Sequence, residues 1–305
     1  MKLSHIRDIL AVAECGSLRA AGRHLNIAQP AITRSIREIE RELGVSLFER
    51  HAKGVRPTQM GQAFLRRAKA IEAELRRVQD EIEQLKGHSS GQVAVALSSA
   101  SSIALLPSAI AAFRKRFPDA LLKISEGLFQ AVEAEILDGQ LDFYVGPIDP
   151  TISNTRLMVE KLFDNRRIVA AREGHPLADA KSLTELEGAA WIRPTLSARS
   201  SEADFNAMFA EFGVKPPRIA MHVNSALMTL ITVASSDLLT IVPQQWLEFP
   251  ATGERIVGLD LKEKLESAPL CIVRRHDMPL TPMAEHFCDL MRRASGHYVT
   301  RRNKA

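Results

Sequence analysis

Basic side chains recur at helical spacing near the N-terminus, where they could bind a polyanion. Arg34 and Arg37 lie on one side of a predicted helix, and its other side carries the apolar residues Ile32, Ile36, Ile39 and Leu43. Guanidinium groups on an exposed helix face can contact phosphates and base edges. We therefore expect nucleic-acid contacts from Gln29, Pro30, Ala31, Thr33, Arg34 and Arg37.

Short polar loops farther along the chain could bind a small anion. They are residues 98–102, 195–201 and 224–225, and each follows a predicted strand and precedes a predicted helix. Hydroxyls and free N–H groups at a helix N-terminus favour anions. The candidate residues are Ser98, Ser99, Ala100, Ser101, Ser102, Phe129, Thr195, Ser197, Arg199, Asn224 and Ser225. Alternatively, the hydroxyls only cap their helices.

The excess positive charge is confined to the N-terminal segment. Residues 1–57 hold ten Lys and Arg against six Asp and Glu, whereas the rest of the chain balances at 30 against 30. Binding to phosphates requires such a local excess. The overall hydrophobic content of 46% is ordinary for a globular protein with a sizeable core.

Three predicted elements would position the basic face. A helix over 1–15 braces a second over 18–25, whose small residues allow the helix that begins near Pro30 to approach closely. This arrangement is typical of a helix-turn-helix. Residues 50–57 then predict a two-stranded wing that carries Arg50, Lys53 and Arg56. The alternative is an amphipathic helix pair inside a larger bundle.

Residues 58–86 predict one long helix with a heptad seam. Thr58 can cap it, and the seam is formed by Phe64, Ala68, Ile71, Leu75, Val78, Ile82 and Leu85. So narrow a stripe favours pairing with a second copy of the same helix. Such a pair would bring together two helix-turn-helix units, one for each half-site. The alternative is packing on the chain's own C-terminal part.

After a break at 87–91, strands alternate with helices. The pattern predicts strands at 93–97, 121–125 and 141–145 with helices between them, and a second such set from 167 to 242. A strand at 270–274 and a helix at 282–294 end the chain. Alternation of this kind is typical of a parallel α/β sheet.

The chain resembles the LysR-type transcriptional regulators. The resemblance is strong over residues 3–65 and rests on Gly16-Ser17-Leu18, Ala20-Ala21, Gln29-Pro30-Ala31-Ile32, Leu43-Gly44, Leu47-Phe48-Glu49-Arg50, and Thr58 with Gly61. Ala28, Thr33 and Pro57 depart from the family's usual residues. The length and order of the later segments also fit the family.

This resemblance implies three domains. They are a winged helix-turn-helix over 1–58, a dimerisation linker helix over 59–88, and a two-lobed α/β effector domain over 91–305, similar to periplasmic binding proteins. Lobe I would comprise about 91–161 and 268–305, and lobe II about 162–267. It further implies promoter DNA and a small organic acid as partners, a homodimer that commonly pairs into a homotetramer, and RNA polymerase contact if the protein is an activator.

Enzymatic motifs are missing from the sequence. We find no G-x-S-x-G, phosphate-binding P-loop, H-E-x-x-H or paired Cys-His spacing, so we expect neither a catalytic site nor a metal or cofactor. Cys15, Cys271 and Cys288 are scattered and are expected to be reduced, with redox sensing by the last two as an alternative. No membrane segment or signal peptide is evident, so we expect a cytoplasmic protein. An effector-independent DNA binder, or an enzyme with an accessory DNA-binding domain, remains the alternative function.

Overall fold

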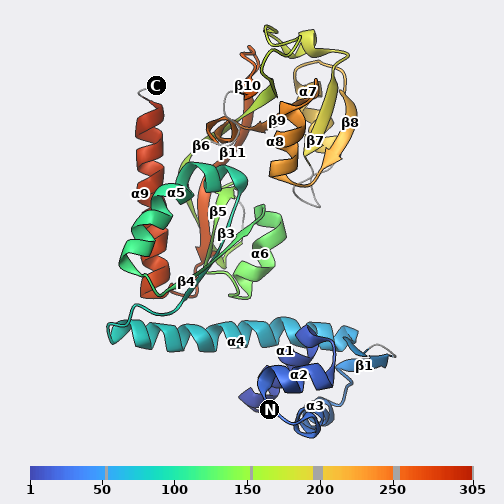
Figure 1. Cartoon of the computed structure of the whole chain (residues 1–305), viewed down its shortest axis with the longest axis vertical. Helices are drawn as coiled ribbons and strands as arrows, with labels where there is room; N and C mark the ends of the chain where they lie inside the picture. The colour runs from blue at the N-terminus through green and yellow to red at the C-terminus, as the bar shows by residue number, and fades with distance from the viewer. Residues whose placement is uncertain (52–53, 152–153, 195–201, 250–254, 304–305) are drawn as a thin grey trace. The chain divides into compact units, whose positions relative to one another are not determined.

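The computed structural model describes the chain except for residues 52–53, 152–153, 195–201, 250–254 and 304–305. The chain divides into two compact units (Figure 1). The first comprises Met1–Ile82 with Asp138–Gln140, and the second comprises Glu83–Leu137 with Leu141–Ala305.

The first unit begins with three helices and a wing, as the sequence predicts. The helices are α1 (Leu3–Cys15), α2 (Leu18–Leu25) and α3 (Gln29–Leu43), and the wing pairs β1 (Phe48–His51) with β2 (Gly54–Pro57). Ile32, Ile36 and Ile39 are buried in the helical core, whereas Leu43, at the end of the predicted stripe, is 44% exposed. The close approach of α2 depends on Gly22, since a Cβ there would lie 2.7 Å from the Ile27 carbonyl oxygen.

The long helix α4 (Gln59–Leu85) begins at the predicted cap. The Thr58 hydroxyl accepts a hydrogen bond from the Gly61 N–H at 2.9 Å and donates one to the Ser46 carbonyl at 2.7 Å. The helix thereby passes very close to the segment before β1, because a Cβ on Gly61 would lie 1.9 Å from the Leu47 carbonyl oxygen. Only glycine fits there.

The heptad seam of α4 is divided between two environments. Phe64 and Ala68 pack on Ile6 and Leu10 of α1. The sequence predicts Phe64 in the seam of the dimer linker, but the structure packs its ring in the core of the first unit. The rest of the seam is exposed at 37 to 73%: Ile71, Leu75, Val78, Ile82 and Leu85. A continuous apolar stripe over more than three turns therefore faces solvent.

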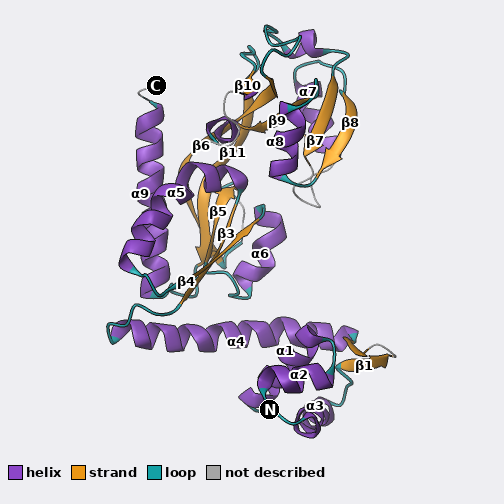
Figure 2. Ribbon diagram, in the orientation of Figure 1, coloured by secondary structure: helices purple, strands orange, loops and turns teal. Residues whose placement is uncertain are grey.

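The second unit is built on one nine-stranded sheet with the order β4-β3-β5-β11-β6-β9-β7-β8, in which β10 also pairs with β6 (Figure 2). One end of the sheet forms lobe I with β3 (Gln92–Leu97), β4 (Leu121–Glu126) and β5 (Phe143–Pro147). The helices α5 (Ser99–Arg116) and α9 (Pro282–Arg302) cover one face of these strands, and α6 (Phe129–Leu137) covers the other.

Lobe II occupies the other end of the sheet. Its strands are β7 (Ala190–Pro194), β8 (Arg218–Val223), β9 (Leu239–Pro243) and β10 (Ile256–Gly258). Its helices are α7 (Glu202–Glu211) and α8 (Ala226–Ala234), with two short 3-10 helices, η1 (Leu183–Leu186) and η2 (Gln244–Glu248). Two separate apolar clusters fill this lobe, one containing Trp191 and the other Trp246.

Two long strands connect the lobes, β6 (Leu157–Arg172) and β11 (Leu265–Arg275). They run antiparallel, with Asn165 opposite Ser267 and Arg167 opposite Leu265, and the register shifts between Ser267 and Leu270. The sequence predicts only the apolar stretches 167–171 and 270–274 of these strands. The sheet is consequently mixed, because β6 and β11 run antiparallel to their neighbours, whereas each lobe's own strands pair in parallel.

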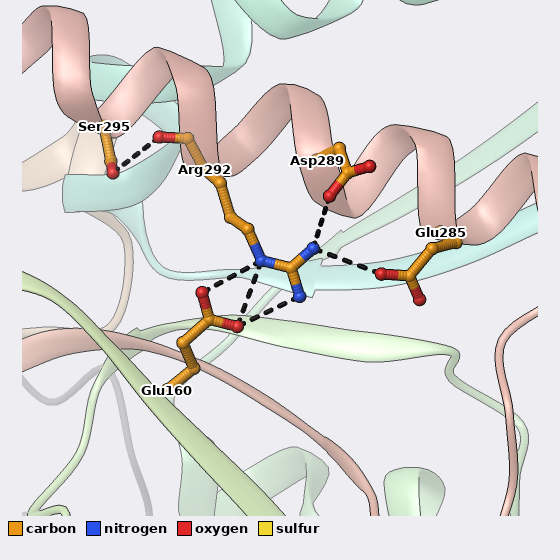
Figure 3. Close-up of polar contacts among 5 residues, drawn as sticks. All are labelled: Glu160, Glu285, Asp289, Arg292 and Ser295. Carbon is orange, nitrogen blue, oxygen red and sulfur yellow. Dashed lines mark hydrogen bonds and ion pairs between the residues drawn. The ribbon is translucent and has the colours of Figure 1, made fainter.

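A charge cluster holds α9 against the first half of β6 (Figure 3). The Arg292 guanidinium binds both oxygens of Glu160 at 2.9 to 3.0 Å, Glu285 at 3.1 Å, and Asp289. The hydrogen bonds that Arg292 donates to these carboxylates, above all to Glu160, raise the pKa of its guanidinium, so this cation stays charged. The C-terminal helix is therefore bound to the strand that leads into the cavity described below.

Gly61→Ala should lower the free energy of unfolding of the first unit by about 3 kcal/mol, because the new methyl group meets a backbone carbonyl that cannot swing aside. Urea unfolding followed by circular dichroism measures this. The matched control is Gly296→Ala in α9, where a Cβ meets nothing within 4 Å. That control should raise stability by about 0.5–1 kcal/mol, and equal effects of the two substitutions would contradict the packing argument.

Candidate functional site

The N-terminal half of α3 presents a polar, basic face to solvent. Gln29, Pro30, Thr33, Arg34, Arg37, Glu38 and Arg41 line a shallow groove on it. Pro30 occupies the first turn, and the Thr33 hydroxyl donates to the Gln29 carbonyl at 3.0 Å, which closes that turn. Ala31 is exposed beside them. All the α3 residues expected to contact DNA therefore gather on one accessible face.

Arg34 forms an ion pair on this face. Its side chain is 82% exposed, and its Nε donates to Glu38 Oε1 at 2.7 Å. The hydrogen bond from Arg34 lowers the pKa of the Glu38 carboxyl, so the pair is ionised at neutral pH. Arg37 makes no ion pair with any described residue. Arg34 is thus oriented along the helix by its ion pair with Glu38, whereas Arg37 is an exposed cation without a described carboxylate partner.

The wing carries its two described arginines on different sides. Arg56 pairs across the ribbon with Glu49, and Arg50 pairs with Val55. Since successive residues of a strand alternate between faces, Arg50 and Arg56 project from opposite faces of the ribbon and do not form one cluster. The sequence predicts one cluster of these arginines with Lys53, which lies outside the described residues.

A cavity of about 410 Å³ lies between the two lobes at the carboxyl ends of β3, β7 and β9. Lobe I contributes the N-terminus of α5 together with Leu128, Gln130 and Pro147. Asn165, Arg167 and Ser267 of the connecting strands also line it. Lobe II supplies the largest share: Arg193, Pro194, Phe205, Met208, Ile241, Val242, Pro243 and Trp246. A cavity of this size fits a small organic molecule.

Only part of the predicted serine loop faces the cavity. Ser98 and Ala100 line it but are buried, and the Ser98 hydroxyl caps the helix by accepting from the Ser101 N–H. The Ser101 hydroxyl donates to the Val145 carbonyl at 2.6 Å beneath the cavity, and Ser102 is not among the lining residues. Ser99 remains as the serine whose side chain is available to a ligand.

Phe129 was expected to face the effector, and this expectation was wrong. Its ring is 2% exposed and packs on Tyr144 at 5.9 Å between ring centroids, inside lobe I. Phe129 is the first residue of α6, and the burial of its ring turns its neighbours Leu128 and Gln130 toward the cavity.

The cavity wall contains two arginines that the sequence analysis did not select. Arg193 is 8% exposed, and its Nη1 lies 3.4 Å from His222 Nδ1. Arg167 is partly buried, and its Nη1 donates a hydrogen bond to Met208 Sδ at 3.1 Å. No described carboxylate pairs with Arg167, and burial alone lowers its pKa. A desolvated cation without a counter-charge creates a site for an anion.

Other predicted effector residues lie elsewhere. Asn224 and Ser225 line a smaller recess of about 190 Å³, together with Ser99 and the exposed carboxylate of Glu126. This carboxylate makes the recess less suited to an anion than the main cavity. Thr195, Ser197 and Arg199 lie outside the described residues, so the second predicted loop has no structural account.

The buried cysteines are poorly suited to redox chemistry. Burial raises the pKa of Cys271 to about 11 and that of Cys288 to about 12, and both thiols therefore stay protonated at neutral pH. Within the described part of the chain, no three His, Cys, Asp or Glu side chains are grouped as metal ligands. No described helix is both long and apolar enough to cross a bilayer.

Two family models match the chain. Residues 3–62 match the bacterial regulatory helix-turn-helix protein model of the lysR family, and residues 86–296 match the LysR substrate binding domain. The HTH-type transcriptional regulator GbpR of Azospirillum brasilense is 27% identical over 300 residues, covering 97% of this chain and 87% of GbpR.

Solved structures agree in fold over almost the whole length. The crystal structure of CbnR, a LysR family transcriptional regulator, superposes with a TM-score of 0.71 at 23% identity, covering 97% of this chain and 99% of CbnR. Full-length CbnR in complex with its target DNA gives a TM-score of 0.72 at 22% identity, covering 96% of this chain and 100% of CbnR. The two-part architecture, a helix-turn-helix unit followed by a bilobed α/β domain, is that of these proteins.

Proposed function

Since the chain belongs to the LysR family of DNA-binding transcriptional regulators, we propose that it binds promoter DNA through α3 and the wing, and that a small organic anion in the interlobe cavity controls this binding. The names of its relatives are those of regulators, which decides against the enzyme alternative. The observation that carries the proposal is Arg167, a partly buried cation without a described carboxylate partner in the wall of a ligand-sized cavity.

For the DNA face, the supporting facts are exposure and charge. Gln29, Arg34 and Arg37 stand on one accessible side of α3, and an extended arginine can reach a base edge in the major groove. Arg50 and Arg56 are exposed on opposite faces of the wing, from which each would contact a different backbone phosphate. The charge excess of residues 1–57 provides the attraction that precedes both kinds of contact.

For the effector, the supporting facts are the polar and apolar groups that line the cavity. The Arg167 guanidinium, the N-terminus of α5 and the Ser99 hydroxyl are its polar groups. Leu128, Met208 and Ile241 supply apolar surface. We propose a carboxylate or sulfonate with a compact apolar body, whose charge binds Arg167 and whose other end receives a hydrogen bond from α5.

We further propose that the exposed seam of α4 pairs with the same seam of a second copy. The apolar residues Ile71, Leu75, Val78, Ile82 and Leu85 follow heptad spacing and face solvent. A two-fold pair of α4 helices would bury them and place two α3 helices on successive half-sites. Residues 1–58, 59–88 and 91–305 would then be reader, linker and effector domain.

Effector control works as a population shift in this proposal. The cavity is lined from both lobes, so a ligand that touches both favours the lobe arrangement in which both sets of contacts are made. Because the linked readers must match two half-sites, a change of lobe arrangement alters the DNA affinity of the assembly.

Arg34→Ala should weaken binding to the specific promoter site by about 1–3 kcal/mol and reduce discrimination between bases, if Arg34 reads a base edge. Fluorescence anisotropy at fixed salt, on specific and scrambled duplexes, measures both effects. Lys115→Ala, an exposed residue of α5, is the control and should change neither. A uniform loss on both duplexes would assign Arg34 to phosphate contact instead.

Replacing Leu75 and Val78 together by glutamate should convert the protein to monomers, because the paired seam would bury like charges. Analytical ultracentrifugation gives the mass, and the monomer should lose affinity for a site with two half-sites. Gln79→Glu, beside the seam, is the matched control and should leave the mass unchanged. The pairing would be refuted by an unaltered mass of the double variant.

Arg167→Met should abolish anion binding to the full chain while leaving promoter affinity without ligand unchanged. Calorimetric titration with benzoate, hexanoate and sulfate measures the binding, and a promoter-affinity assay measures the response. Arg166→Met is the control, since the exposed neighbouring side chain does not line the cavity. If the unaltered chain binds none of these probes and its DNA affinity does not change when they are added, an effector-independent regulator becomes the better description.

A further inference from the structure

A tryptophan of lobe II is hydrogen-bonded to the cavity serine of lobe I. Trp246 Nε1 donates to Ser99 Oγ at 3.0 Å, and the indole is 1% exposed. Both residues line the cavity. From this contact we infer that Trp246 positions the Ser99 hydroxyl for the effector and makes effector affinity depend on the contact between the lobes. This inference rests on the proposed function.

The direction of the bond determines where the serine proton points. An indole N–H can only donate, so Ser99 Oγ is the acceptor and its own proton must go elsewhere. None of the described residues accepts that proton. Ser99 stands at the first turn of α5, where unpaired N–H groups also face the cavity end of the helix. The hydroxyl is therefore available to donate to an acceptor atom of a bound ligand.

The neighbouring serines cannot take over this role. Ser98 Oγ lies 3.0 Å from Ser101 Oγ and caps the Ser101 N–H, and Ser101 donates to the Val145 carbonyl. Their hydroxyls are engaged within lobe I whether or not a ligand is present. Of the two serines of this loop that line the cavity, Trp246 thus acts on Ser99, whose proton has no acceptor among the described residues.

The segment that carries Trp246 is fixed to lobe I at several points. The hydroxyl of Tyr298 on α9 donates to Glu248 Oε1 at 2.6 Å, Arg301 binds Glu248 Oε2 at 3.1 Å, and Arg302 binds the Gln244 side-chain oxygen at 2.7 Å. Ile103 of α5 packs in the same apolar cluster as Trp246. The 3-10 helix η2 therefore belongs to lobe II in sequence but contacts two helices of lobe I.

These contacts couple ligand binding to the lobe contact. When Ser99 donates to a ligand, its oxygen becomes a stronger acceptor for the indole, because adjacent hydrogen bonds polarise one another. A bound anion then tightens the contact between η2 and α5. By reciprocity, any arrangement that breaks the indole bond lowers anion affinity by the same factor.

The test is a double-mutant cycle on the full chain, with benzoate, hexanoate and sulfate as probes. Trp246→Phe and Ser99→Ala should each weaken the binding of the best probe about two- to tenfold, the range expected for one hydrogen bond. The double variant should lose no more than Ser99→Ala alone, since that substitution already removes both the indole bond and the bond from Ser99 to the ligand. Ser99→Thr, which keeps a hydroxyl, should restore most of the affinity.

A spectroscopic readout separates positioning from a packing defect. The chain has two tryptophans, so Trp191→Phe leaves Trp246 as the sole indole signal in a labelled sample. Exchange of this N–H with solvent should slow when the probe binds and should accelerate in Ser99→Ala without ligand.

The outcomes distinguish this inference from the proposed function. Additive losses in the cycle would overturn the positioning role of Trp246. So would an indole exchange rate that changes neither in Ser99→Ala nor on addition of the probe. The proposed function would survive either result if Arg167→Met still abolishes binding. If the unaltered chain binds no probe, the proposed anion control fails, and this inference fails with it.

Discussion

The antiparallel pairing of β6 with β11 is the constraint on which the effector domain depends. These two strands connect the lobes and continue the sheet from one into the other. Their register sets Asn165 opposite Ser267 and places Arg167 two residues further along, so three polar side chains line the cavity at fixed spacing. The Arg292 cluster holds α9 on the same β6 strand and thereby links the last helix to the cavity.

Features that depend on local spacing could be predicted from the sequence. The bounds of α2 and α3, the Thr58 cap and the alternation of strands and helices follow from short-range periodicity and turn chemistry, and the structure has them where they are expected. The exposed side of α3 could be predicted for the same reason, since one turn of helix fixes which residues share a face. The wing shows the limit of this reasoning. Arg50 and Arg56 are close in sequence, but the strand register places their side chains on opposite faces of the ribbon.

The cavity itself could not be predicted, because its residues meet only through long-range pairing. Arg193 is the single charge in the apolar strand Ala190–Pro194, and this mismatch was the available sequence signal for a functional position. Arg167 follows Arg166 in a charged stretch of β6 and carries no such signal. Trp246 and Ser99 are 147 residues apart, and no local pattern predicts that they meet. Phe129 was wrongly placed in the site because an apolar side chain can line either a cavity or a core, and here tertiary packing buries the ring against Tyr144.

The solvent-facing stripe of α4 has a consequence for how this protein must be handled. If a second copy covers this apolar area, as proposed above, the folding free energy depends on protein concentration by mass action. A melting temperature recorded for a dilute sample would then understate the stability in a concentrated one. Chains that have not yet paired would carry the same exposed stripe.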